Sequence, residues 1–75
     1  MQILVNGEAI HIDEMSVAQY LESLSIDPRR VAIELNLDIL PKGEYGKSLL
    51  KEGDMLEIVH FVGGGQDGRR KMHAQ

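Results

Sequence analysis

The sequence predicts an α+β fold in which one amphipathic helix covers one face of a small β-sheet. Apolar residues alternate with polar ones in stretches near both ends of the chain, as is typical of strands with one buried face. One stretch between them has the i, i+3, i+4, i+7 spacing of a helix. The 75 residues should form a single domain, because so short a chain buries only about 60% of its unfolded surface and leaves no apolar residues for a second core.

The chain should open with a β-hairpin over residues 2–13. Two short alternating stretches, residues 3–5 and 10–12, are separated by the dipeptide Asn6-Gly7. Both residues of this dipeptide tolerate the positive φ angles that a two-residue hairpin turn requires.

The next segment has the start signals of a helix that begins after Ser16. Ser16 and Gln19 form an S-x-x-Q capping box, in which each side chain accepts a hydrogen bond from a free backbone N–H of the first turn. Asp27-Pro28 should end the helix, since the residue before a proline avoids the helical conformation. The apolar face, which we expect in the core, comprises Val17, Tyr20, Leu21 and Leu24.

Three further strands are predicted beyond the proline. Residues 31–35 alternate with one buried face, residues 38–40 form a short strand that Pro41 closes, and residues 55–62 form the longest strand. Residues 42–51 should form an irregular crossover with one helical turn near residues 45–49. We interpret Arg29 and Arg30 as the edge of a strand.

Composition excludes several classes of function. The sequence has no cysteine, which excludes disulfides, thiolate metal sites and a cysteine nucleophile. Residues 1–65 contain five Lys and Arg against eleven Asp and Glu, and this acidic balance argues against nucleic acid as a partner, because phosphate binding needs a clustered basic face. The three histidines lack metal-ligand spacing, so no metal is expected. No nucleophile, base and orienting group cluster in the sequence, so we do not expect an enzyme.

No stretch of the sequence predicts membrane insertion or export. No apolar run approaches the roughly 18 residues of a membrane span. The first residues, MQILVNGEAI, lack the basic region and long apolar stretch of a signal peptide. We therefore expect a cytoplasmic protein without a membrane partner.

The most specific segment is KEGDMLEIVHFVGGG, residues 51–65, in which an apolar strand leads directly into three glycines. Together with NGE at residues 6–8, SVAQYLESLSIDPRRVAIELN at 16–36 and ILPKGEY at 39–45, it resembles the ThiS family of sulfur carriers in thiamine biosynthesis. The resemblance covers residues 1–65. It implies a β-grasp (ubiquitin-like) fold, with a mixed sheet that one main helix covers and the last strand in the centre of that sheet.

The resemblance also implies a mechanism. A ThiF-like adenylyltransferase would use ATP to convert a C-terminal carboxylate to an acyl-adenylate, and a sulfur donor would then produce a thiocarboxylate. A ThiG-like thiazole synthase would accept that sulfur. Aligned with the family's ending, Gly64 and Gly65 would be the diglycine and Gly65 would carry the sulfur. Glycine suits this step because, without a Cβ, it lets a narrow channel close around the chain end. The carrier itself would bind no cofactor.

Residues 66–75, QDGRRKMHAQ, depart from the family's pattern. They leave Gly65 in a peptide bond, and an amide carbonyl cannot attack ATP as a carboxylate does. We therefore expect a carrier domain of residues 1–65 and a basic C-terminal extension, residues 66–75, that is disordered or removed by a processing protease. The alternative is that residues 66–75 are a frayed terminus without a function.

Alternation along residues 55–62 also predicts a partner-binding surface. If Leu56 and Ile58 face the helix, an apolar patch is left on the opposite face of the sheet. The alternative is that the sheet curls, or that a bulge shifts the register, so that Phe61 joins the core. The patch comprises Met55, Val59 and Phe61, beside Glu57. The residues expected to bind partners are Val59, Phe61, Val62 and Gly63.

Two other functions are consistent with the same features. The small subunit of molybdopterin synthase shares the fold, the diglycine and the thiocarboxylate, although the short length and the LEIVHFVGGG ending favour thiamine biosynthesis. An interaction module of the β-grasp type that carries no sulfur would use the glycines as a linker.

Overall fold

The chain opens with the predicted hairpin of β1 (Gln2–Val5) and β2 (Glu8–His11). This computed structural model describes residues 1–62 and 71–74, with side chains described through Phe61. The two strands pair antiparallel, with Val5 opposite Glu8. Asn6 (φ 50°) and Gly7 (φ 85°) form the turn between them, which confirms the role expected of this dipeptide.

Helix α1 (Val17–Ser23) begins with the predicted capping box. The backbone N–H of Gln19 donates to Ser16 Oγ at 3.1 Å, and the backbone N–H of Ser16 donates to Gln19 Oε1 at 2.9 Å. These two bonds satisfy donors that have no partner within the helix. The helix start is therefore fixed by residues only three positions apart.

The helix ends earlier than the sequence predicts. Its last residue is Ser23, and Ser25 adopts a left-handed conformation with φ 58°. The N–H groups of Ser25 and Ile26 donate back to carbonyl groups of the last turn at 2.9 and 3.0 Å, the pattern of a Schellman motif. Leu24 follows the last helical residue and is 45% exposed, so the expectation that it lies in the core is wrong.

The remaining elements follow without a second α-helix in the described residues. They are η1 (Pro28–Arg30), β3 (Val31–Leu35), β4 (Asp38–Leu40), η2 (Lys42–Glu44), β5 (Met55–Val62) and β6 (Lys71–Ala74). Arg29 and Arg30 thus belong to a 3-10 turn and not to a strand edge. The crossover contains the 3-10 helix at residues 42–44 and, directly after it, the predicted helical turn, in which the Ser48 N–H donates to the Glu44 carbonyl at 2.9 Å.

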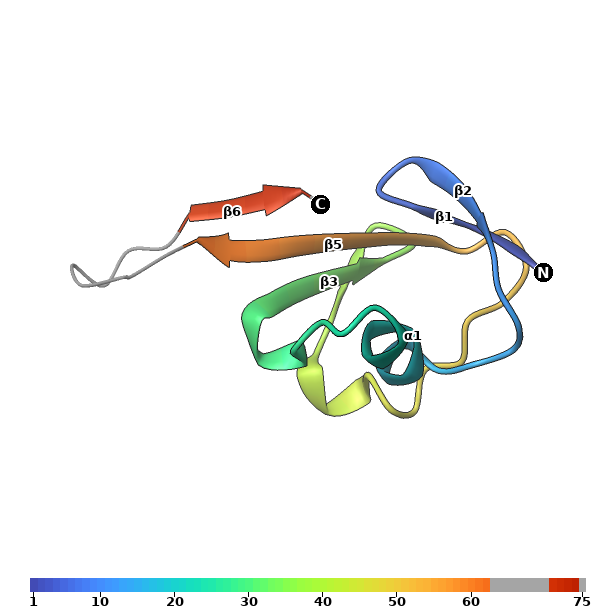
Figure 1. Cartoon of the computed structure of the whole chain (residues 1–75), viewed down its shortest axis with the longest axis horizontal. Coiled ribbons are helices and arrows are strands. Elements are labelled where there is room, and N and C mark those ends of the chain that lie inside the picture. Colours follow the sequence, from blue (N-terminus) through green and yellow to red (C-terminus); the bar gives the residue numbers. More distant parts are fainter. Residues whose placement is uncertain (63–70, 75) are drawn as a thin grey trace.

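Five strands form a mixed sheet in the order β2-β1-β5-β3-β4, and β6 pairs with β5 beyond the end of β1. Strand β5 is parallel to β1 and antiparallel to β3. Figure 1 shows α1 and both 3-10 turns on the same side of this sheet. This arrangement is the predicted β-grasp class, with the last carrier-domain strand in the centre. The core between the layers consists of Ile3, Val17, Tyr20, Leu21, Val31, Ile33, Tyr45, Leu50, Leu56 and Ile58.

Candidate functional site: the C-terminal end of the central strand

Strand β5 is the central strand of the sheet, and the chain leaves the domain at the C-terminal end of this strand. Its first half is held on both sides, with Met55 opposite Leu4 of β1 and Leu56 opposite Leu35 of β3. Its second half runs past the end of β1 towards residue 63 (Figure 1). Gly63, Gly64 and Gly65 lie outside the described residues, so the diglycine and the sulfur-carrying role of Gly65 stay predictions.

The alternation predicted along β5 is confirmed from Met55 to Ile58. Leu56 and Ile58 are buried against the helix layer, while Met55 is 41% exposed and Glu57 is exposed. Val59 and Phe61 are half-buried and do not belong to the apolar side chains that pack on the core. The bulge that would have placed Phe61 in the core is therefore absent from the described strand. The Val62 side chain and Gly63 lie outside the described residues, and partner binding by these four residues stays a prediction.

The side chain of Asn6 holds β5 at the point where β1 ends. The backbone N–H of Ile58 donates to Asn6 Oδ1 at 2.8 Å, and Asn6 Nδ2 donates to the Ile58 carbonyl at 3.2 Å. The amide thus imitates one more residue of a neighbouring strand. It satisfies both backbone groups of a buried residue that would otherwise lack partners on this side. Asn6 thereby fixes the position from which the rest of β5 extends.

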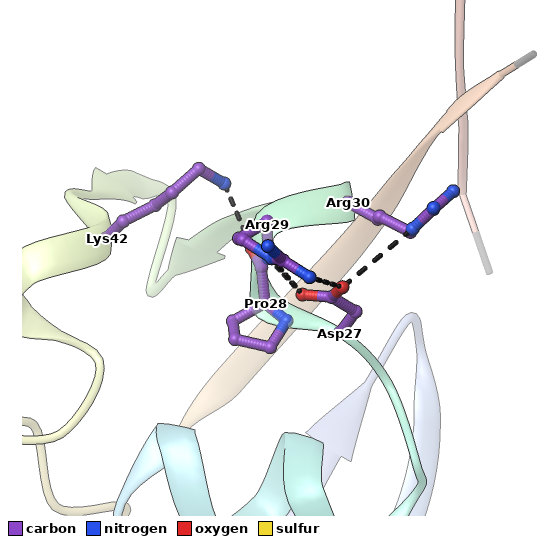
Figure 2. Close-up of polar contacts among 5 residues, drawn as sticks. All are labelled: Asp27, Pro28, Arg29, Arg30 and Lys42. Atoms are coloured by element: carbon purple, nitrogen blue, oxygen red, sulfur yellow. Dashed lines mark hydrogen bonds and ion pairs between the residues drawn. The ribbon is translucent and has the colours of Figure 1, made fainter. Parts of the chain in front are cut away.

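Lys42 lies beside the exit of β5, where the 3-10 turns meet the sheet. Its Nζ donates to the carbonyl groups of Val31 at 2.7 Å and Pro28 at 3.0 Å; Figure 2 shows the bond to Pro28. The same ammonium lies 5.5 Å from the ring centroid of Phe61 and 5.7 Å from that of Tyr45, within the range of a cation–π contact. This contact orients the last described side chain before the glycines.

Asp27 and two arginines form a polar cluster close to Lys42 (Figure 2). Arg29 Nη2 and Nε donate to the Asp27 carboxylate at 2.9 and 3.1 Å, and the Arg29 backbone N–H donates to it at 2.9 Å. Arg30 Nε lies farther away, at 3.8 Å. These bonds lower the pKa of Asp27 from its ordinary 3.8 to about 2, with the Arg29 side chain as the largest cause and the backbone N–H as the second. Asp27 therefore stays ionised and caps η1 at every physiological pH.

The pKa of Asp27 can be tested by substitution. In an NMR titration the wild-type carboxyl should titrate at about pH 2, and Arg29→Ala should return its pKa towards 3.8. The matched control Arg30→Ala should change the pKa little. Because the folded pKa lies below the unfolded one, the stabilisation is present above pH 3.8 and is lost as the pH falls from 3.8 to about 2. A wild-type pKa near 3.8 would contradict the bidentate geometry.

Strand β6 lies along the edge of β5 that extends past β1. Its residues pair antiparallel with β5, from Val59 opposite Ala74 to Val62 opposite Lys71. These four residues belong to the extension that was expected to be disordered or removed, and here they form a strand. Removal of the extension stays a prediction, as does the domain boundary at Gly65.

The described residues show neither a metal site nor a membrane span. Within residues 1–62 and 71–74, no three His, Asp or Glu side chains come together as ligands for an ion. The helices of this part of the chain are too short or too polar to cross a bilayer.

The fold defines a class, that of small β-grasp domains in which one helix covers one face of a mixed sheet. The ThiS family model matches residues 3–65, and the chain belongs to the ThiS family. The crystal structure of the thiamine biosynthesis protein ThiS from Geobacter metallireducens superimposes with a TM-score of 0.75, at 30% identity, over 87% of this chain and 100% of that one.

Two curated relatives are similar to most of this chain. The sulfur carrier protein ThiS of Bacillus subtilis is 38% identical over 53 residues, which cover 71% of this chain and 80% of that protein. A thiazole synthase of Paramagnetospirillum magneticum is 44% identical over 68 residues, or 89% of this chain. The chain spans only 21% of the length of that thiazole synthase.

The contacts that shape this site join residues far apart in the sequence, and no local pattern predicts them. Asn6 was recognised only as a turn residue, and Lys42 only as part of a crossover. Lys42 and Phe61 are 19 positions apart, and no local pattern signals that they meet. The Asn-Gly signal did locate Asn6, but its bonds to Ile58 depend on which strand lies next to the turn.

Proposed function

We propose that this chain is a sulfur carrier of thiamine biosynthesis, and not itself an enzyme, which carries sulfur as a thiocarboxylate on Gly65. Membership of the ThiS family over residues 3–65 is the observation that carries the proposal, and the matched segment ends at that glycine. The names of its relatives and of its structural neighbour favour thiamine over molybdopterin biosynthesis.

The chemistry needs little from the carrier except an accessible chain end. A ThiF-like adenylyltransferase would bind ATP, the Gly65 carboxylate would attack the α-phosphate, and pyrophosphate would leave. A sulfur donor would then attack the acyl carbon and expel AMP, so that sulfur replaces one carboxylate oxygen. The carrier's contribution is positional, because the Asn6 amide clamps the central strand from which the chain continues to Gly65.

The end of β5 is the surface that we propose partners bind. Fixing the backbone of four residues in an active-site channel costs about 4 to 8 kcal/mol, so contacts outside the channel must offset that cost. Val59 and the Phe61 ring are half-exposed beside the glycines, and Lys42 already holds the ring in place. Val62 and Gly63 would continue this contact into the channel.

Thiazole synthase is the proposed sulfur acceptor. A relative that bears this name contains a segment similar to nearly the whole of this chain. Two functions within one polypeptide indicate that the corresponding domains work on the same chemistry.

The extension of residues 66–75 would have to be removed before sulfur loading. A peptide bond after Gly65 leaves no carboxylate to adenylate, and β6 occupies the edge of β5 beside Val59 and Phe61. Cleavage after Gly65 by a processing protease would therefore expose both the acid and this edge.

Mass spectrometry of the loading reaction tests the proposal. A chain that ends at Gly65, incubated with a ThiF-like enzyme, ATP and a sulfur donor, should gain about 16 Da as oxygen is exchanged for sulfur. The 75-residue chain should gain nothing, and a chain that ends at Gly64 serves as the control for the correct terminus. If no adenylate or thiocarboxylate forms on the chain ending at Gly65, the domain is an interaction module and the proposal is wrong.

A further inference from the structure

The face of the sheet that points away from α1 contains a hollow that the proposed function does not use. It measures about 200 Å³ and lies between β1, β5 and the turn that joins β3 to β4. The apolar side chains that line it are Leu4, Leu37 and Met55, and the charged ones are Glu34 and Glu57. Among the described residues no element covers this face, since α1 and the 3-10 turns lie on the other side (Figure 1).

Large apolar side chains surround the hollow and are open to solvent. Leu37 is 78% exposed and Met55 is 41% exposed. Ile39, which is 78% exposed, lies opposite Glu34 in the sheet and so extends the same face. Single exposed apolar residues need no explanation, but a group of them around one hollow marks a surface for another molecule.

Two carboxylates lie at the centre of this face, and no cation among the described side chains pairs with them. Glu34 of β3 lies directly opposite Glu57 of β5, and the Cβ atoms of such pairs are about 4.5 to 5.5 Å apart. Like charges in this position destabilise a sheet. Ion pairs in the described part of the chain join only Asp27 with Arg29 and Arg30, so no described cation neutralises either glutamate.

Leu37 is also held in an unfavourable backbone conformation. It has φ 75° in the two-residue turn Asn36-Leu37 between β3 and β4. A side chain with a Cβ is disfavoured there, and glycine is the usual residue at this position. Three features that lower the stability of the fold thus occur at one place: a strained leucine, a like-charge pair and exposed apolar side chains. Conflicts of this kind between local preference and fold are expected at functional sites.

We propose that this hollow receives an arginine side chain of the thiazole synthase that accepts the sulfur. The aliphatic part of an arginine would lie against Leu37 and Met55, and its planar guanidinium would bridge the carboxylates of Glu34 and Glu57. Arginine fits better than lysine because its several N–H donors in a fixed plane can reach two carboxylates at once. The apolar rim of Leu37 and Ile39 would exclude water from the contact.

Charge supports this choice of occupant. Residues 1–65 contain eleven acidic against five basic side chains, so a partner surface with an excess of positive charge is favoured. When the guanidinium binds, its positive charge offsets the repulsion between the two glutamates and attracts both carboxylates to the partner. The proposal rests on the proposed function, because it identifies how the acceptor of the sulfur docks on the carrier.

Binding measurements with matched variants test the arginine site. Chains that end at Gly65 would be titrated with the thiazole synthase of the same organism, and the double variant Glu34→Gln/Glu57→Gln should bind at least about 10-fold more weakly than wild type. Leu37→Gly should also weaken binding. The control Glu22→Gln removes one charge from α1, on the opposite side of the sheet, and should bind like wild type.

Thermal unfolding separates a docking role from a structural one. The Glu34→Gln/Glu57→Gln variant should have a Tm about 1 to 5 °C above wild type, because like-charge repulsion is removed. Leu37→Gly should unfold no earlier than wild type, because the turn is relieved of strain. Weaker binding by a protein that is equally or more stable cannot arise from misfolding.

Two different results would overturn the two proposals. Unchanged affinity of the double variant, or no binding of the wild-type chain to thiazole synthase, overturns the arginine site even where the sulfur-loading reaction succeeds. Failure of sulfur loading overturns the proposed function, whatever the binding measurements show.

Discussion

Leu21→Ala should lower the free energy of unfolding by about 2 to 5 kcal/mol. Leu21 is fully buried and joins the two-turn helix α1 to the sheet. A helix of seven residues has no stability of its own in water and depends on packing of this face. Since a domain of this size has only about 4 to 11 kcal/mol in total, the substitution should lower Tm by roughly 10 to 40 °C. Thermal and urea denaturation followed by circular dichroism would measure it.

Leu24→Ala is the matched control for this prediction. Leu24 has the same side chain and lies three positions further along, but it is 45% exposed after the helix has ended. Its truncation should cost about 1 kcal/mol or less, since little apolar surface returns to water. Equal losses for the two variants would mean that the helix continues as the periodic pattern suggests, with Leu24 in the core.

Asn6→Ala should destabilise the domain by about 2 to 4 kcal/mol. The substitution removes both bonds to the backbone of Ile58. Because Ile58 is buried, its N–H and carbonyl would be left without partners at the point where β1 ends. Hydrogen exchange should show the effect locally. Relative to wild type, the substitution should accelerate exchange of the Ile58 amide more than exchange of the amides in β2.

Asn36→Ala is the control that isolates these bonds from the turn conformation. Asn36 also has a positive φ, 53°, and its Oδ1 also accepts a bond from β5, from the Met55 N–H at 2.9 Å. This contact is exposed, so water can replace it and the loss should be about 1 kcal/mol. If both variants lose the same amount, the left-handed conformation and not the amide clamp explains the effect at Asn6.

The local elements of the fold could be predicted because their signals lie within a few residues. The Asn6-Gly7 turn and the Ser16–Gln19 capping box each depend on groups one to three positions apart, and both are confirmed. The end of the helix was predicted wrongly because Pro28 is a stronger sequence signal than the left-handed Ser25, which stops the helix earlier. Serine has no special preference for that conformation, so no residue type at this position predicts the earlier helix end.

The candidate site was predictable only in part. Strict alternation placed Leu56 and Ile58 inward and Met55 and Glu57 outward, as the structure confirms. The opposition of Glu34 and Glu57, by contrast, depends on the register between β3 and β5. That register is set by packing of both strands on the core, and the pattern of either strand alone does not specify it.

The amino-acid sequence by itself determined the order of the opening hairpin, the helix and the three strands that follow it, the inward face of the first half of β5 and the glycine segment that follows that strand. These properties depend on backbone propensities and on alternation, which act between near neighbours. The tertiary structure decided that Asn6 clamps Ile58, 52 positions away, that Lys42 holds Phe61, and that two glutamates meet beside Leu37. Such contacts arise only when the sheet closes in its own order, because burial of one shared core brings distant segments into a single register.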